Sequence, residues 1–377
     1  MRLSLRGQKD RLISSLKHMG WMRFLLAVAV VFHHSTTPGN IPLVDGHQAV
    51  RLFYIISGFY MALVLGEKYP LNRRGLWIFY TNRAARIFPV YWVVLIGAAV
   101  FYGSALIWTQ RMPERFQWYS LLREGGHGGF LVGIGLSQVI LFGLDWFSLF
   151  DFQGSILGLG GTVSGGKTAG FLCLVPQAWT LAVELMFYLL APFLVQTRSR
   201  WLIVLCGIIT LIRTSLSIWK PHESLSFNYF WFPLQIPFFL MGILSYRWMK
   251  ISTDFWRNHW MRIGGGWMAF MVVMGYGWIP VGVAPILSCG AIGLFIPALF
   301  HIEGKVGEFL GELSYPIYVV HILVKWIMLG LLGVQQAGEK KVDGALLVVA
   351  SMFAAIGIEK LIGTRVEAWR ASRTKLL

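Results

Sequence analysis

The sequence has little charge, few acidic residues and almost no cysteine. Charged residues make up 13% of its 377 positions, about half of the ~25% that is usual for soluble domains. So few charges cannot solvate the surface of a chain of this length, which excludes a soluble globular enzyme. The cysteines lie too far apart for a disulfide framework or a metal-binding knuckle. We assign Cys173, Cys206 and Cys289 to packing. We predict no metal site and no permanently bound cofactor.

Apolar and basic residues are abundant instead. Hydrophobic residues reach 56% and aromatic residues 15%, which excludes a disordered chain. Lysine and arginine number 33 against 17 aspartates and glutamates, so the formal net charge is +16. A basic chain can indicate a nucleic-acid partner, but here the basic residues stand beside long apolar runs. In that position they orient a protein in a membrane, so we predict a lipid bilayer and no nucleic acid as partner.

Apolar segments of membrane-spanning length recur along the chain. A helix needs roughly twenty apolar residues to cross about 30 Å of hydrocarbon. We predict an all-α fold, a polytopic membrane bundle of about ten transmembrane helices. The predicted spans are 22–36, 49–66, 87–108, 175–196, 201–218, 229–249, 262–279, 283–300, 314–333 and 344–363.

One further apolar stretch, 130–150, is harder to place. The segment after it, 154–170, is rich in glycine. Glycine at this density weakens a helix, so we interpret the segment as a loop or a broken, re-entrant piece. Most basic residues that flank the spans fall on one side when residues 109–174 cross the membrane an even number of times. We favour ten spans plus a large, partly embedded outer segment over an additional pair of crossings.

The same charge bias places both termini in the cytoplasm, because loops rich in lysine and arginine stay inside. The chain is then divided into a basic tail at 1–20, a membrane domain at 21–365 and a second basic tail at 366–377. We expect the first apolar run to remain as a transmembrane helix, because no small-residue cleavage site follows it.

Ionisable residues inside a membrane span are costly and mark candidate functional sites. Arg23 and His34 are eleven residues apart in the first span, so on a helix they share one face and are separated by roughly 16.5 Å. This geometry suits a long anionic ligand that is anchored at one end and reacts at the other. Alternatively, Arg23 is a topology charge and the histidine bonds to the backbone.

Three more charged residues need an explanation. Glu184 lies within an apolar span and needs a cation, a proton or a water-filled cavity; a purely structural ion pair is the alternative. Arg83 and Arg86 are three residues apart and are neighbours on a helix face. They are suited to clamp a phosphate, although membrane-flanking arginines have the same appearance.

Two further strings contain polar groups. Ser57 and Gly58 form a small-residue step in an apolar run, which favours close helix packing over a chemical role for the serine. His321 lies inside the ninth predicted span, shortly after Tyr315 and one turn after Tyr318. Structural and functional roles for this histidine stay open.

These strings together resemble the acyltransferase-3 family of integral-membrane acyltransferases, over about residues 20–365. One departure is Arg51, at a position where many members carry an acidic residue. The resemblance is carried by Arg23 followed after ten residues by His34, by Phe-Tyr-Ile-Ile-Ser-Gly-Phe at 53–59, by Arg-x-x-Arg-Ile-x-Pro-x-Tyr at 83–91, by Trp-x-Leu-x-x-Glu-x-x-Phe-Tyr at 179–188 and by Ser-Tyr-x-Ile-Tyr-x-x-His at 314–321.

The resemblance implies an O-acyltransferase in the bacterial inner membrane. Its implied partners are acyl-coenzyme A, commonly acetyl-coenzyme A, as co-substrate, and a surface or exported glycan or lipid-linked glycan as acceptor. The role of the family's catalytic base falls on His34, and that of the preceding arginine on Arg23. A carrier or flippase for a lipid-linked sugar is the alternative function.

A mechanism follows as a hypothesis. The coenzyme phosphates rest against Arg23, Arg83 and Arg86, and the acceptor hydroxyl loses its proton to His34. Glu184 orients the imidazole of His34. Ser57, Tyr315 and His321 are the candidates for contact with the substrate or the developing oxyanion. A covalent acyl-histidine intermediate stays open.

Overall fold

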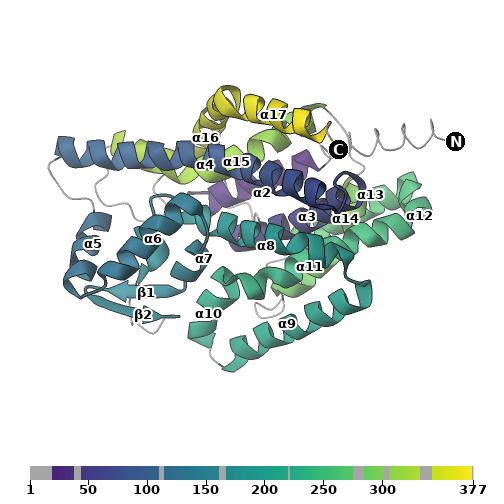
Figure 1. Cartoon of the computed structure of the whole chain (residues 1–377), viewed down its shortest axis with the longest axis horizontal. Helices are drawn as coiled ribbons and strands as arrows, with labels where there is room; N and C mark the ends of the chain where they lie inside the picture. Colours follow the sequence, from purple (N-terminus) through teal and green to yellow (C-terminus); the bar gives the residue numbers. More distant parts are fainter. Residues whose placement is uncertain are drawn as a thin grey trace.

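The computed structural model describes residues 19–37, 44–109, 114–160, 167–219, 221–274, 284–300, 305–331, 342–375 and 377. Helices dominate these residues (Figure 1). The helices that correspond to the predicted spans are α2 (Gly20–His33), α3 (Gly46–Glu67), α4 (Arg73–Thr109), α8 (Trp179–Gln196), α9 (Ser199–Trp219), α11 (Phe232–Ile251), α13 (His259–Met274), α14 (Ala284–Phe300), α15 (Lys305–Leu331) and α16 (Gly344–Ile358).

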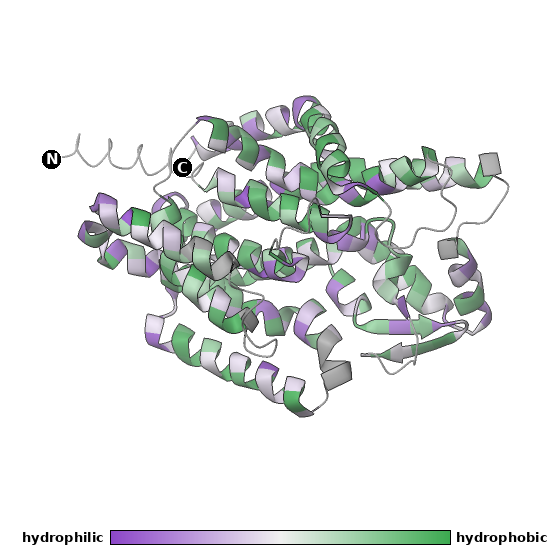
Figure 2. Cartoon of the chain, turned by 180° about the vertical axis from the view of Figure 1, so that it is seen from behind, coloured by the Kyte–Doolittle hydropathy of each residue, from purple (hydrophilic) through white to green (hydrophobic). Residues whose placement is uncertain are grey.

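Six of the described helical segments are long and apolar enough to cross a membrane. Figure 2 shows hydrophobic residues along most of the helices, and many large apolar side chains point outward. Such a surface suits lipid and not water. The prediction of an all-α, polytopic membrane bundle is confirmed. The end of the seventh predicted span, 275–279, lies outside the described residues.

Helix α4 is much longer than its predicted span at 87–108. Its 37 residues extend about 55 Å, well beyond the hydrocarbon thickness, and Pro89 lies near its middle. Directly after this proline, Tyr91 donates to the carbonyl of Gln138 at 2.5 Å, and Trp92 donates to that of Val139 at 2.9 Å. These bonds attach the outer segment to α4.

The outer segment contains short elements: α5 (Glu114–Glu124), α6 (Gly128–Ile140), α7 (Leu144–Phe147), η3 (Ala169–Leu172) and η4 (Pro176–Ala178). At 13 residues, α6 extends about 20 Å and is too short to cross the membrane alone. Asp145 is fully buried and accepts a hydrogen bond at 3.4 Å from the backbone N–H of Phe232, at the start of α11. Burial raises the pKa of Asp145 to about 6.

The glycine-rich segment was expected to be a loop or a re-entrant piece, and this expectation is wrong for its described part. Three short strands, β1 (Phe150–Gln153), β2 (Ile156–Leu159) and β3 (Lys167–Thr168), form an antiparallel sheet in the order β2-β1-β3. Gly154 has a φ of +60° in the turn between β1 and β2. A glycine adopts this conformation without strain, so it supports a hairpin here.

The centre of the bundle depends on close contact between α3 and α11. A Cβ atom on Gly58 would lie 2.1 Å from the carbonyl oxygen of Phe239, and one on Gly242 would lie 2.0 Å from that of Ile55. The two backbones therefore touch where both residues lack a side chain. This contact confirms that the Ser57-Gly58 step permits helix packing.

The chain ends in a helix that folds back onto the bundle. After α16, a single π turn, η6 (Glu359–Gly363), leads into α17 (Thr364–Thr374), which lies beside α4 (Figure 1). Most of the predicted basic tail at 366–377 is thus part of the folded structure.

Candidate active site

A cavity of about 560 Å³ lies between α2, α3, α4, α8, α15 and α17. Its volume falls in the range of small-molecule sites. Six of the eight predicted site residues line it, namely Arg23, Ser57, Arg83, Arg86, Glu184 and Tyr315. The charged and hydroxyl side chains that the sequence singled out therefore share one chamber.

Two cations of the cavity come from α4. The spacing of Arg83 and Arg86 puts both on one helix face, as predicted, and both face the chamber. Arg83 is only 7% exposed. The rings of Phe79 and Tyr188 lie 5.8 and 5.9 Å from its guanidinium carbon. Among the described residues, its Nε atom has no hydrogen-bond partner.

Glu184 lies on α8 and bonds to neutral groups. Its Oε1 atom accepts a hydrogen bond at 3.1 Å from Ser57 and a short one from Tyr188, one turn further along α8. None of the contacts described for Glu184 reaches His34. The predicted pairing of these two residues is therefore not found: Glu184 is at the level of Arg23, whereas His34 follows the far end of α2.

The hydroxyl of Tyr315 forms a hydrogen bond between two helices. Its hydroxyl donates to the carbonyl oxygen of Ile87 at 2.6 Å and so ties α15 to α4. Deeper in the chamber, the hydroxyls of Tyr318 and Thr180 are 2.7 Å apart. Both residues line the cavity, so Tyr318 presents a polar group where Tyr315 was expected to do so.

His34 and His321 lie together beyond this point. Their ring centroids are 5.3 Å apart, and the ring of Tyr318 is 6.0 Å from that of His321. Neither histidine is among the cavity-lining residues. The predicted passage from Arg23 to His34 is thus found only in part: the chamber includes Arg23 and Tyr318, and neither histidine lines it.

The hydrogen bonds of His321 define which of its ring nitrogens carries the proton. The ring is fully buried, and Nδ1 is 2.7 Å from the carbonyl oxygen of Tyr318. A carbonyl can only accept, so Nδ1 must donate. In the neutral ring Nε2 then has a free lone pair, and it is buried without a hydrogen-bond partner in the described part of the chain. His321 can accept a proton or a hydrogen bond there.

The model of an acyltransferase domain, acyltransferase-3, matches residues 17–359, nearly the whole chain. The chain belongs to the acyltransferase-3 family. Comparison with curated proteins and with solved structures finds no match. The membrane bundle and the family together establish a membrane acyltransferase.

The acyltransferase has a second polar cluster beside His34, which the sequence did not indicate. The side chains of His33, Asp45 and His47 bring one ligand atom each within 4.8 Å of one another, a spacing from which a metal ion could be held. The 3.0 Å bond between His33 Nδ1 and Asp45 already accounts for much of this closeness. Burial opposes ionisation of Asp45, but the bond from His33 and the charge of His47 outweigh it and lower its pKa.

Sequence reasoning also missed Lys68 and Arg370 as cavity-lining residues. Both belong to the basic residues that flank the predicted spans or lie in the predicted C-terminal tail. The amphipathic pattern of 364–374, with Glu367 and Arg370 spaced for an i,i+3 pair, could have predicted a helix. Nothing local could have shown that this helix returns to α4.

Proposed function

We propose that this acyltransferase transfers an acyl group from acyl-coenzyme A, with acetyl as the first donor to test, to a hydroxyl of a surface or exported glycan. The cellular location that fits is the inner membrane of a bacterium. The observation that carries the proposal is the set of guanidinium groups from Arg23, Arg83 and Arg86 around one chamber in an apolar bundle.

Clustered cations in this setting favour a polyanionic ligand. A partly buried charge is unfavourable unless it is paired, and neighbouring guanidiniums repel one another. Phosphates match the guanidinium fork and can accept two hydrogen bonds from it. Coenzyme A joins such phosphates to a long, mostly uncharged arm that ends in a thioester. The arm fits a chamber that continues from the arginines to Tyr318.

The chemistry is then assigned to His34. Its imidazole takes the proton of the acceptor hydroxyl as that oxygen attacks the thioester carbonyl. The carbon–sulfur bond breaks, and the leaving thiolate takes the proton back from the imidazolium to give free coenzyme A. General-base help of this kind contributes roughly 10²–10⁴-fold.

His321, rather than Glu184, supports the base in this proposal. Its Nε2 lone pair can accept a hydrogen bond from the ring of His34 and fix the tautomer, because its Nδ1 proton is held by Tyr318. Oxyanion contact by neutral His321 would require a proton on Nε2, which this arrangement disfavours. The Tyr318 hydroxyl, which lines the chamber, can donate to the oxyanion when it turns away from Thr180 and Gln177, its partners in the structure.

The test is a thiol-release assay on the purified full chain with acetyl-coenzyme A and bacterial glycan acceptors. We expect free thiol to appear with wild type and to fall at least a hundredfold with His34→Ala. The matched control is His259→Ala, a histidine exposed on α13, which should retain activity. Full thiol release by the His34 variant would refute the role of this residue, and failure of wild type to bind acetyl-coenzyme A would refute the donor.

A further inference from the structure

A second group of cations lies where the C-terminal helix α17 covers the cavity. Lys68 follows α3, Arg83 comes from α4 and Arg370 from α17, and all three line the chamber. They interact electrostatically, since Arg83 and Arg370 are among the charges that act on Lys68. The C-terminal helix thus brings Arg370 to two like charges from an early part of the sequence.

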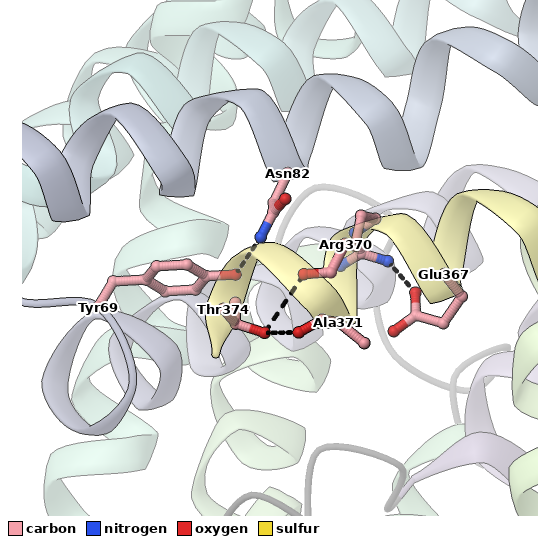
Figure 3. A network of polar contacts seen from close by, with 6 residues as sticks. All are labelled: Tyr69, Asn82, Glu367, Arg370, Ala371 and Thr374. Atoms are coloured by element: carbon pink, nitrogen blue, oxygen red, sulfur yellow. Dashed lines mark hydrogen bonds and ion pairs between the residues drawn. The ribbon is translucent and has the colours of Figure 1, made fainter. Parts of the chain in front are cut away.

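The hydrogen bonds of this group leave donors unused. Figure 3 shows the Arg370 side chain bonded to Glu367, with Tyr69 and Asn82 nearby. Within the described residues, the Nε atoms of both Arg83 and Arg370 are buried and lack hydrogen-bond partners. Buried donors are nearly always satisfied in proteins, so these point to an anion that completes them.

Charge balance supports the same conclusion. The carboxylate that acts on both Lys68 and Arg370 is that of Glu367. Its side chain is 61% exposed, which weakens the pairing. The other cavity-lining carboxylates lie on α8, α15 and η6, and are Glu184, Glu308, Glu312 and Glu359.

The neighbouring positive charges also affect the pKa of Tyr69. Burial of its hydroxyl opposes ionisation. Arg83, the hydrogen bond from Asn82, and Lys68 together outweigh burial and hold the pKa of Tyr69 below its usual value. The same cations that act on Tyr69, namely Arg83, Lys68 and Arg370, line the part of the chamber next to α17.

We propose that Lys68, Arg83 and Arg370 form a separate phosphomonoester site, which holds the 3′-phosphate of coenzyme A. This inference rests on the proposed function and deepens it. Arg23 and Arg86 are left for the pyrophosphate, and Arg86 acts on both Arg23 and Arg370. The ligand has these two kinds of phosphate group, and all five cations line one chamber.

The site makes α17 a determinant of donor specificity. Arg370 is contributed by the C-terminal helix, so the 3′-phosphate is recognised only when α17 is packed on α4. Dephospho-coenzyme A has the pyrophosphate and the same arm but lacks this group. The enzyme should therefore discriminate between the two donors through Arg370 and Lys68.

The experiment compares binding of acetyl-coenzyme A and acetyl-dephospho-coenzyme A to the purified full chain by calorimetry. Wild type should bind the first at least tenfold more tightly, as expected for charge-assisted hydrogen bonds. Arg370→Gln should remove this preference by weakening acetyl-coenzyme A alone. The matched control is Arg365→Gln, an exposed arginine on the same helix, which should behave as wild type.

The outcomes separate the two proposals. If wild type binds both donors equally, or if Arg370→Gln weakens both equally, the phosphomonoester site is refuted while the proposed function stands. If wild type binds neither donor, the proposed function fails. Folding of each variant is checked by its elution profile and Tm. If Arg370→Gln does not fold, Lys68→Gln, on a different segment, is measured in its place. Lys68→Gln must then lose the preference for acetyl-coenzyme A, and an unchanged preference overturns the proposal.

Discussion

His321 offers the sharpest test of how the histidines beyond the cavity work. Its two ring nitrogens have different surroundings: Nδ1 donates to the carbonyl of Tyr318, whereas Nε2 has no hydrogen bond to a described residue, and the ring lies near that of His34. An asparagine amide reaches about as far as Nδ1 and a glutamine amide about as far as Nε2. His321→Asn and His321→Gln therefore remove one function each.

The expected effects differ in kind. His321→Asn keeps a donor for the carbonyl of Tyr318 and loses the acceptor near His34, so kcat should fall tenfold to a hundredfold, as for other partners that orient a catalytic group, with little change in Tm. His321→Gln leaves that carbonyl unsatisfied, which costs about 1–3 kcal/mol, so Tm should fall while more of the activity remains.

The assay is thiol release measured alongside thermal unfolding in detergent for both variants. His127→Asn in the outer segment is the matched control, since its ring bonds to the backbone of Ser155 and not to the histidine cluster. If the two variants lose activity and stability in the same proportion, His321 is a packing residue and the reasoning about its nitrogens is refuted.

Three other substitutions test separate parts of the structure. Gly58→Ala should lower the free energy of unfolding by about 1–3 kcal/mol, and with it the Tm, because its Cβ would meet the backbone of α11. Gly103→Ala, with open space around it, should not; equal Tm values would contradict the close packing. Tyr315→Phe should lower Tm but keep kcat within a few-fold of wild type, since its hydroxyl donates a hydrogen bond to the backbone of α4. A hundredfold loss of kcat would instead show that Tyr315 donates to the oxyanion. Because the pKa of Asp145 is raised from 3.8 to about 6 on folding, the folded chain holds an extra proton between these values and loses up to about 3 kcal/mol of stability as the pH rises through them. Asp145→Asn should flatten the Tm profile between pH 4 and 6.5, and an unchanged slope would show that another group causes it.

The sequence predicted the membrane helices well because each span is a local signal. Twenty apolar residues mark a helix wherever they occur. The errors fall where tertiary contacts extend or redirect the chain. Helix α4 begins well before its predicted span, with polar residues such as Arg83 that face the cavity. The glycine-rich segment pairs as a hairpin through a single turn at Gly154.

In the site, too, local signals were predictable and contacts between helices were not. The residues were identified from strings within one span, and six of them share the chamber. Which residues touch one another across helices was not predictable, so Glu184 was paired with His34. Its partner Tyr188 was in the same string, one turn away, and an i,i+4 contact could have been considered first.

The length of α4 has a mechanical consequence. Arg83 and Arg86 precede Pro89 in this helix, and directly after the proline Tyr91 and Trp92 hold the outer segment through Gln138 and Val139. A displacement of the helix at the arginines would therefore move the outer segment as well. Pro89, between the two ends, removes one bond from the helical ladder and sets how stiffly the two sides communicate.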